Sequence, residues 1–142
     1  MILTIIFIIA SSLMKVIIDT IQFHWNSSIF SKIKKGTKLH DWLNPEFSWQ
    51  NKWKEGYKPL GEKFWGSSRW FAFLTDGWHL FDMLKTLFFI CALTFSIVYI
   101  PFSLILIKNI IIAKSIDTII LYSIYGLIFN VLFNLLEIKK FK

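Results

Sequence analysis

Three long apolar runs limit what this chain can fold into. The run from Leu87 to Ile107, LFFICALTFSIVYIPFSLILI, contains 21 residues and no charged side chain. A helix of that length is about 30 Å long, which matches the hydrocarbon core of a bilayer. The runs over residues 1–18 and 118–136 are also long enough to cross it. The sequence therefore predicts an all-α, polytopic membrane protein with three transmembrane helices.

The composition supports a lipid environment. The chain has 142 residues, enough for one domain, and 55% of them are hydrophobic, including fifteen Phe and seven Trp. A soluble domain of this size could not bury so much apolar surface. The net charge of +7 suits either nucleic acid or an anionic membrane surface, and the apolar runs favour the membrane. We therefore expect anionic lipid headgroups as partners and no nucleic acid.

The boundaries of the spans are predicted from charges and proline. We expect the first helix over residues 1–18, retained rather than cleaved, because no basic residue precedes Lys15 and no small-residue cleavage site comes after it. A signal-like segment is the alternative. The second helix is expected over 80–107 with a kink near Pro101, which cannot donate a backbone hydrogen bond. A short loop (108–117), the third helix and a basic tail (137–142) complete the chain.

Residues 19–79 are expected to form a loop subdomain between the first two spans. A disordered linker would be poor in aromatic residues. Tryptophan favours the headgroup layer, since its ring is apolar and its N–H needs a polar partner. The sequence thus predicts an ordered unit at the membrane interface, and it carries every tryptophan of the chain: Trp25, Trp42, Trp49, Trp53, Trp65, Trp70 and Trp78.

Basic residues predict the orientation. Nine Lys or Arg lie in the long loop and three in the tail, whereas the short second loop carries only Lys108 and Lys114. Because basic loops stay in the cytoplasm, we expect the long loop and the C-terminus to be cytoplasmic and the N-terminus outside. The expected location is a bacterial inner membrane.

The stretch TDGWHLFDMLK, at the start of the second span, is the first candidate site. Asp76, His79, Asp82 and Lys85 recur every three residues, so consecutive pairs share a helix face. A histidine between two carboxylates could bind a metal or accept a proton, which makes His79 and Asp76 candidate catalytic residues. The structural alternative is that Thr75 caps the helix, Asp76 interacts with the helix dipole, and Asp82 pairs with Lys85.

A metal site is a second hypothesis. Asp19, His24, Asp76 and His79 all lie near a membrane boundary, and two histidines with two carboxylates suit zinc or iron. Asp19 and His24 are five residues apart, about 140° around a continuous helix. They converge only if the first helix ends between them.

A third candidate binds lipid phosphate. Ser67, Ser68 and Arg69 come directly after Gly66 and precede the apolar stretch WFAFL, so hydroxyl groups, backbone N–H groups and a guanidinium could converge on an anion. An ordinary serine cap is the alternative interpretation.

Four residues of the third span recur at four-residue steps. Small and amide side chains on one helix face are typical of contacts between membrane helices. We expect this face to pack against the other spans or against a second copy of the chain; it comprises Tyr122, Gly126, Asn130 and Asn134.

Three segments carry a resemblance: FHWNSSIF, NPEFSWQNKWKEG and FWGSSRWFAFLTDGWHLF. Over residues 15–99 the chain resembles an uncharacterised family of small integral membrane proteins. The resemblance implies no activity, and it suggests that the loop is a fixed unit.

Two functions are compatible with these features. The first is an accessory subunit or membrane-associated scaffold that docks a protein partner or forms a homo-oligomer. The second is a membrane-boundary enzyme, or a protein that handles metal ions or protons, acting on a lipid headgroup through Asp76 and His79. A pore of the holin type also has three spans and a basic tail, but it does not need the long aromatic loop.

Overall fold

The computed structural model describes residues 2–98 and 101–137 and is all-helical over this part of the chain, with no strand. Three of its helices are long and apolar enough to cross a membrane. The architecture confirms the all-α prediction with three candidate spans, and it is compatible with an integral membrane protein. The long helices are α1 (Ile2–Phe23), α3 (Gly77–Val98) and α4 (Ile110–Leu136).

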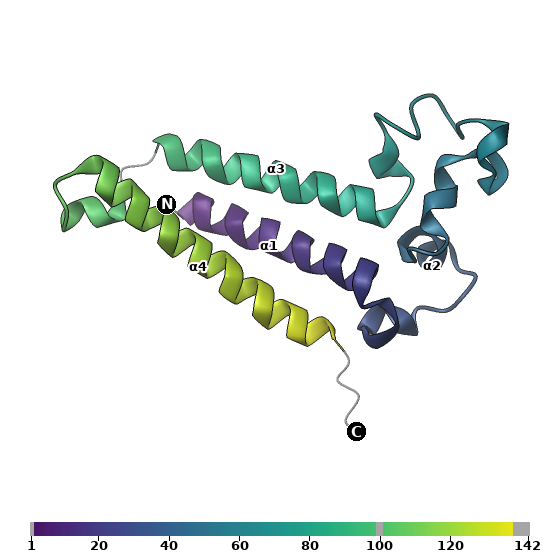
Figure 1. Ribbon diagram of the computed structural model, residues 1–142, viewed down its shortest axis with the longest axis horizontal. Helices are drawn as coiled ribbons and strands as arrows, with labels where there is room; N and C mark the ends of the chain where they lie inside the picture. The colour runs from purple at the N-terminus through teal and green to yellow at the C-terminus, as the bar shows by residue number, and fades with distance from the viewer. Residues whose placement is uncertain (1, 99–100, 138–142) are drawn as a thin grey trace, which may run out of the picture.

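Helix α1 is the central element (Figure 1). It lies between α3 and α4 and contacts both; α3 runs antiparallel to it and α4 parallel. Two adjacent buried serines of α1 make polar contacts with these neighbours. The Ser11 hydroxyl donates to the carbonyl of Lys85 in α3, and the Ser12 hydroxyl to the carbonyl of Tyr125 in α4, each at 3.1 Å. The small polar break in the first apolar run therefore lets three helices approach closely.

The first helix is longer than expected. It continues through Asp19 to Phe23, past the expected boundary at residue 18. One turn earlier on the same face lies Lys15, and its ammonium pairs with the Asp19 carboxylate at 2.5 Å. An i, i+4 ion pair of this kind supports helix over these residues.

The expected kinked helix through Pro101 is also not observed. Helix α3 extends to Val98, and Pro101 has ψ of 133°, which is not helical. Proline lacks an N–H, and here Pro101 directly precedes the short helix η7 (Phe102–Ile105).

The third helix begins at Ile110, eight residues before the expected position. The Asn109 side chain accepts hydrogen bonds from the backbone N–H groups of Ile111 and Ile112, at 3.0 and 3.3 Å. Asparagine is a favoured N-cap, and this cap converts the expected loop 108–117 into the first turns of α4. Of the expected basic tail, residues 138–142 lie outside the described residues.

Between α1 and α3 the chain folds into short helical turns at one end of the three long helices (Figure 1). Its α-helix, α2 (Lys38–Leu43), packs against the start of α3, where a Cβ on Gly77 would lie only 2.6 Å from Leu43 Cδ2. That this region lies at a membrane interface stays a prediction. The 3-10 turns are η1 (Trp25–Ser27), η2 (Ile29–Lys32), η3 (Ser48–Lys52), η4 (Lys54–Gly56), η5 (Lys58–Leu60), η6 (Ala72–Leu74) and, after α3, η7 (Phe102–Ile105).

Candidate functional site

Asp76 is the centre of the candidate site. Its side chain is 2% exposed, and its Oδ1 accepts a hydrogen bond from the backbone N–H of His79 at 2.9 Å. Bonding to the third residue of α3 makes Asp76 the N-cap of that helix. The expected cap, Thr75, instead donates its hydroxyl to the carbonyl of Ala72 at 2.7 Å. A buried carboxylate thus marks the junction between the loop and α3.

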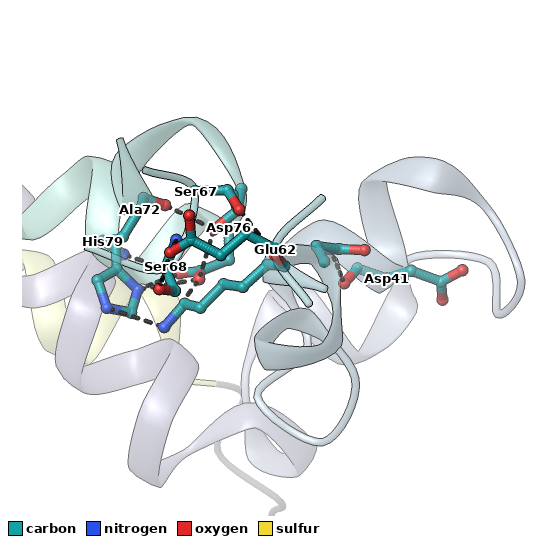
Figure 2. Close-up of polar contacts among 10 residues, drawn as sticks. Asp41, Glu62, Ser67, Ser68, Ala72, Asp76 and His79 are labelled. Atoms are coloured by element: carbon teal, nitrogen blue, oxygen red, sulfur yellow. Dashed lines mark hydrogen bonds and ion pairs between the residues drawn. The ribbon is translucent and has the colours of Figure 1, made fainter. Parts of the chain in front are cut away.

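The same carboxylate orients the His79 ring (Figure 2). His79 Nδ1 lies 2.7 Å from Asp76 Oδ1 and 2.9 Å from Oδ2. An ionised carboxylate can only accept hydrogen bonds, so Nδ1 carries the proton and Nε2 is left as an acceptor.

Lys52 completes the cluster from a distant part of the sequence. Its ammonium group lies 3.2 Å from His79 Nε2 and 3.8 Å from Asp76 Oδ2. The side chain is 17% exposed, and the neighbouring Ser67 hydroxyl donates to the Lys52 carbonyl at 2.8 Å. We call Lys52, Asp76 and His79 the junction cluster. It ties η3 to the first turn of α3.

The junction cluster has two chemical capacities. It is a structural clamp, since each of its three charged or polar groups has a partner within it. It also resembles an acid–base arrangement, because His79 is one-third exposed and a buried carboxylate orients its ring. As long as the Lys52 ammonium donates to Nε2, that nitrogen is occupied. Proton transfer at Nε2 therefore requires Lys52 to move away.

Two other charged residues of the TDGWHLFDMLK stretch lie further along α3. Asp82 and Lys85 form an ion pair with each other, which matches the structural alternative. Both side chains are partly exposed. They do not join the junction cluster.

The four-residue metal site is not assembled. No group of three or more His, Cys, Asp or Glu side chains over residues 2–98 and 101–137 could hold a metal ion. Because α1 continues to Phe23, Asp19 is paired with Lys15 while His24 Nδ1 lies 3.7 Å from Glu137 Oε1. Asp76 and His79 remain together. The other half of the expected zinc or iron ligand set, Asp19 and His24, is paired elsewhere.

The expected phosphate-binding loop already holds an anion. The Glu62 carboxylate accepts hydrogen bonds from the Ser68 hydroxyl and from the backbone N–H groups of Gly66, at 2.8 Å, and Ser68, at 3.4 Å. These bonds, the Ser68 hydroxyl first, hold the pKa of Glu62 below its ordinary value, with a smaller contribution from the Arg69 charge. The stretch is a turn rather than a helix start. The Ser67 hydroxyl donates to the Lys52 carbonyl rather than to this anion. The Glu62 carboxylate therefore takes the position expected for a lipid phosphate.

The polar face of α4 is mostly open. Tyr122, Asn130 and Asn134 are exposed, and a Cβ at Gly126 would meet no side chain and no other segment of the described structure within 4 Å. The two amides bond along their own helix, Asn130 to the carbonyl of Gly126 at 2.9 Å and Asn134 to that of Asn130 at 2.8 Å. The other described spans therefore leave the two amides of this face exposed, and only Tyr122 lies beside a pocket that residues of α1 and α3 also line.

The fold and the junction cluster define a small chain that is all-helical over its described residues, with three candidate spans and a loop tied to them by a buried carboxylate and its two partners. Comparison with protein-family models, with curated proteins and with solved structures finds no match for this chain. Its function therefore has to be inferred from its own residues.

Proposed function

We propose that this chain is an accessory subunit or scaffold of a larger membrane assembly. The observation that carries the proposal is the junction cluster, in which the Asp76 carboxylate accepts hydrogen bonds from the His79 ring and from the His79 backbone N–H at the start of α3, and forms an ion pair with Lys52. Such contacts hold a loop in one position, and an ordered loop loses less conformational entropy when a partner binds it.

The surface that this loop presents suits binding. Trp65 and Trp70 are 79% and 75% exposed, on a segment rich in lysine. Exposed tryptophan beside basic side chains favours either a protein partner or anionic headgroups in the interfacial layer. We place this loop and the C-terminus in the cytoplasm and the N-terminus outside, across a bacterial inner membrane.

The outward face of α4 is the second surface available to a partner. Asn130, Asn134 and Gly126 lie along it, and amide and small residues stabilise contacts between membrane helices. A helix of another subunit or of a second copy fits this face.

Photocrosslinking in intact cells tests the scaffold. A photoreactive amino acid at Trp70 should give a discrete protein adduct, whereas the same group at Leu3, an exposed residue near the start of α1, should give lipid adducts. The adduct at Trp70 should weaken in Asp76→Asn, because that change releases the loop. If positions 65 and 70 both yield no protein adduct, the scaffold function is refuted.

One observation favours a second function. His79 is oriented by a buried carboxylate and is partly exposed, which is the arrangement of a general base. On this alternative the protein acts on a lipid headgroup, with Lys52 leaving Nε2 when substrate binds. His79→Asn should then abolish the cellular activity of a folded protein, whereas His24→Asn should not. Near-stoichiometric zinc or iron in the purified protein would also favour this alternative.

A further inference from the structure

A cleft in the loop region lies apart from the junction cluster. It has a volume of about 830 Å³, within the range of small-molecule sites, and α2 together with the turns η1, η3 and η4 contributes to its lining. Trp25, two residues beyond the end of α1, is part of its wall. The cleft is therefore placed next to the end of a candidate span.

The walls combine flat apolar surfaces with neutral hydrogen-bonding groups. Trp25, Phe47 and Trp53 contribute three aromatic rings. Four side-chain amides also line the cleft; two of them, Asn26 and Gln50, have no hydrogen-bond partner within residues 2–98 and 101–137. Each amide offers both a donor and an acceptor, which is what a hydroxyl group needs.

The charges of the cleft differ from those of the chain. Although the chain carries a net charge of +7, the acidic groups in the cleft outnumber the lysines by three to two. Anionic ligands such as phosphates therefore gain little from this site, in contrast to the lysine-rich surface around it. The two lysines offset most of the negative charge, so a strongly cationic ligand also gains little. The acidic residues are Asp41, Glu46 and Glu55.

One wall has an unusual backbone. Glu55 adopts φ of 53°, a left-handed conformation that non-glycine residues seldom take. The next residue, Gly56, also has positive φ and approaches Gln50 closely: a Cβ there would lie 3.3 Å from Gln50 Oε1. The η4 turn thereby sets the position of the Gln50 amide at the cleft.

We infer that this cleft binds a neutral, polyhydroxylated ligand, that is, a sugar, either free or as the headgroup of a glycolipid. A sugar ring has an apolar face that stacks on tryptophan, and hydroxyl groups that pair with amides and carboxylates. The aromatic walls of the cleft match the apolar face, the unpartnered amides match the hydroxyl groups, and the near-balanced charge matches the neutrality of the ligand. The inference does not depend on the proposed scaffold function.

Saturation-transfer NMR tests the inference on the full chain in phosphatidylglycerol nanodiscs, which avoids sugar-based detergents. The probes are cellobiose, maltose and N,N′-diacetylchitobiose, with inorganic phosphate and tetramethylammonium as charged comparisons. We expect at least one disaccharide to bind at millimolar concentration and both charged probes to give no signal. A second arm adds diglucosyl diacylglycerol to the nanodiscs and monitors tryptophan emission. Binding in this arm alone assigns the ligand to a lipid headgroup, and binding of a free disaccharide assigns it to a soluble sugar.

Substitutions locate the site. Trp53→Ala should weaken binding about ten-fold, the effect of losing one stacking surface. Gln50→Ala should also weaken it and keeps all seven tryptophans, so that unchanged emission shows the loop to be folded. Tyr57→Ala, at an exposed aromatic position outside the cleft, is the matched control and should bind as the unmodified chain does. The inference is overturned if no sugar binds, if only a charged probe binds, or if Trp53→Ala and Gln50→Ala bind as tightly as the control.

Discussion

Replacing Asp76 by Asn should release the loop from α3. As a helix cap alone, Asp76 would tolerate Asn at a cost of about 0.5 kcal/mol, the lost interaction with the helix dipole. Its surroundings predict a larger effect. Asn retains an oxygen for the His79 backbone N–H, but places an NH₂ where Oδ2 now lies 2.9 Å from His79 Nδ1 and 3.8 Å from the Lys52 ammonium. Donors then face donors in a buried site, so we expect a loss of about 2–3 kcal/mol.

Urea unfolding monitored by tryptophan emission measures this loss. Every tryptophan of the chain lies between Trp25 and Trp78, so the emission reports on the loop and the first turn of α3. In mild detergent, the Asp76→Asn midpoint should fall with little change in slope. Asp41→Asn is the control, because its carboxylate is half-exposed and should cost under about 1 kcal/mol. If both variants unfold at the midpoint of the unmodified chain, Asp76 is no more than a cap and the reasoning is refuted.

Single contacts give three further predictions. The pKa of Glu62 is lower in the folded chain than in the unfolded one, so its contribution to stability is present at neutral pH and declines below about pH 4. The Glu62→Gln variant should therefore lose less stability on acidification, which urea midpoints measured across pH would show. Asn109→Ala should remove the cap of α4 at a cost of about 1 kcal/mol, seen as faster hydrogen exchange at Ile111 and Ile112, with Asn109→Asp unchanged. Ser12→Val should separate α1 from α4 and lower thermal stability in detergent, since the buried hydroxyl has no room for a larger group; unchanged stability would contradict the contact.

The three long helices could be predicted because hydropathy and length are local properties of the sequence. Helix ends depend on single side chains, and their prediction from apolar runs alone failed. The Asn109 cap lies outside the third apolar run, and the Lys15–Asp19 pair extends α1 beyond the first. Pro101 marks a break in the second run, but the sequence alone does not show whether a proline bends a helix or lies outside one; here its ψ of 133° is not helical.

The candidate site was only partly predictable. Asp76 and His79 are three residues apart on one helix, so their contact is a consequence of helix geometry. Lys52 lies 27 residues from His79 and is one of nine basic residues in the loop, so nothing local distinguishes it. The acceptor in the Gly66–Ser68 turn is nearer in the sequence: Glu62 precedes Gly66 by four residues, so a contact between them needs only a local turn.

Hydrogen exchange in nanodiscs tests the central claim, that the loop between α1 and α3 is a folded unit fixed to α3. The backbone N–H of Lys63 donates to the Lys52 carbonyl at 2.9 Å, a bond that depends on this loop being folded, and that of His79 donates to Asp76 at the junction with α3. The account predicts that both amides exchange far more slowly than in an unstructured peptide, and that Asp76→Asn accelerates the two together. Exchange of Lys63 at the rate of an unfolded chain, while α1 stays protected, would contradict it.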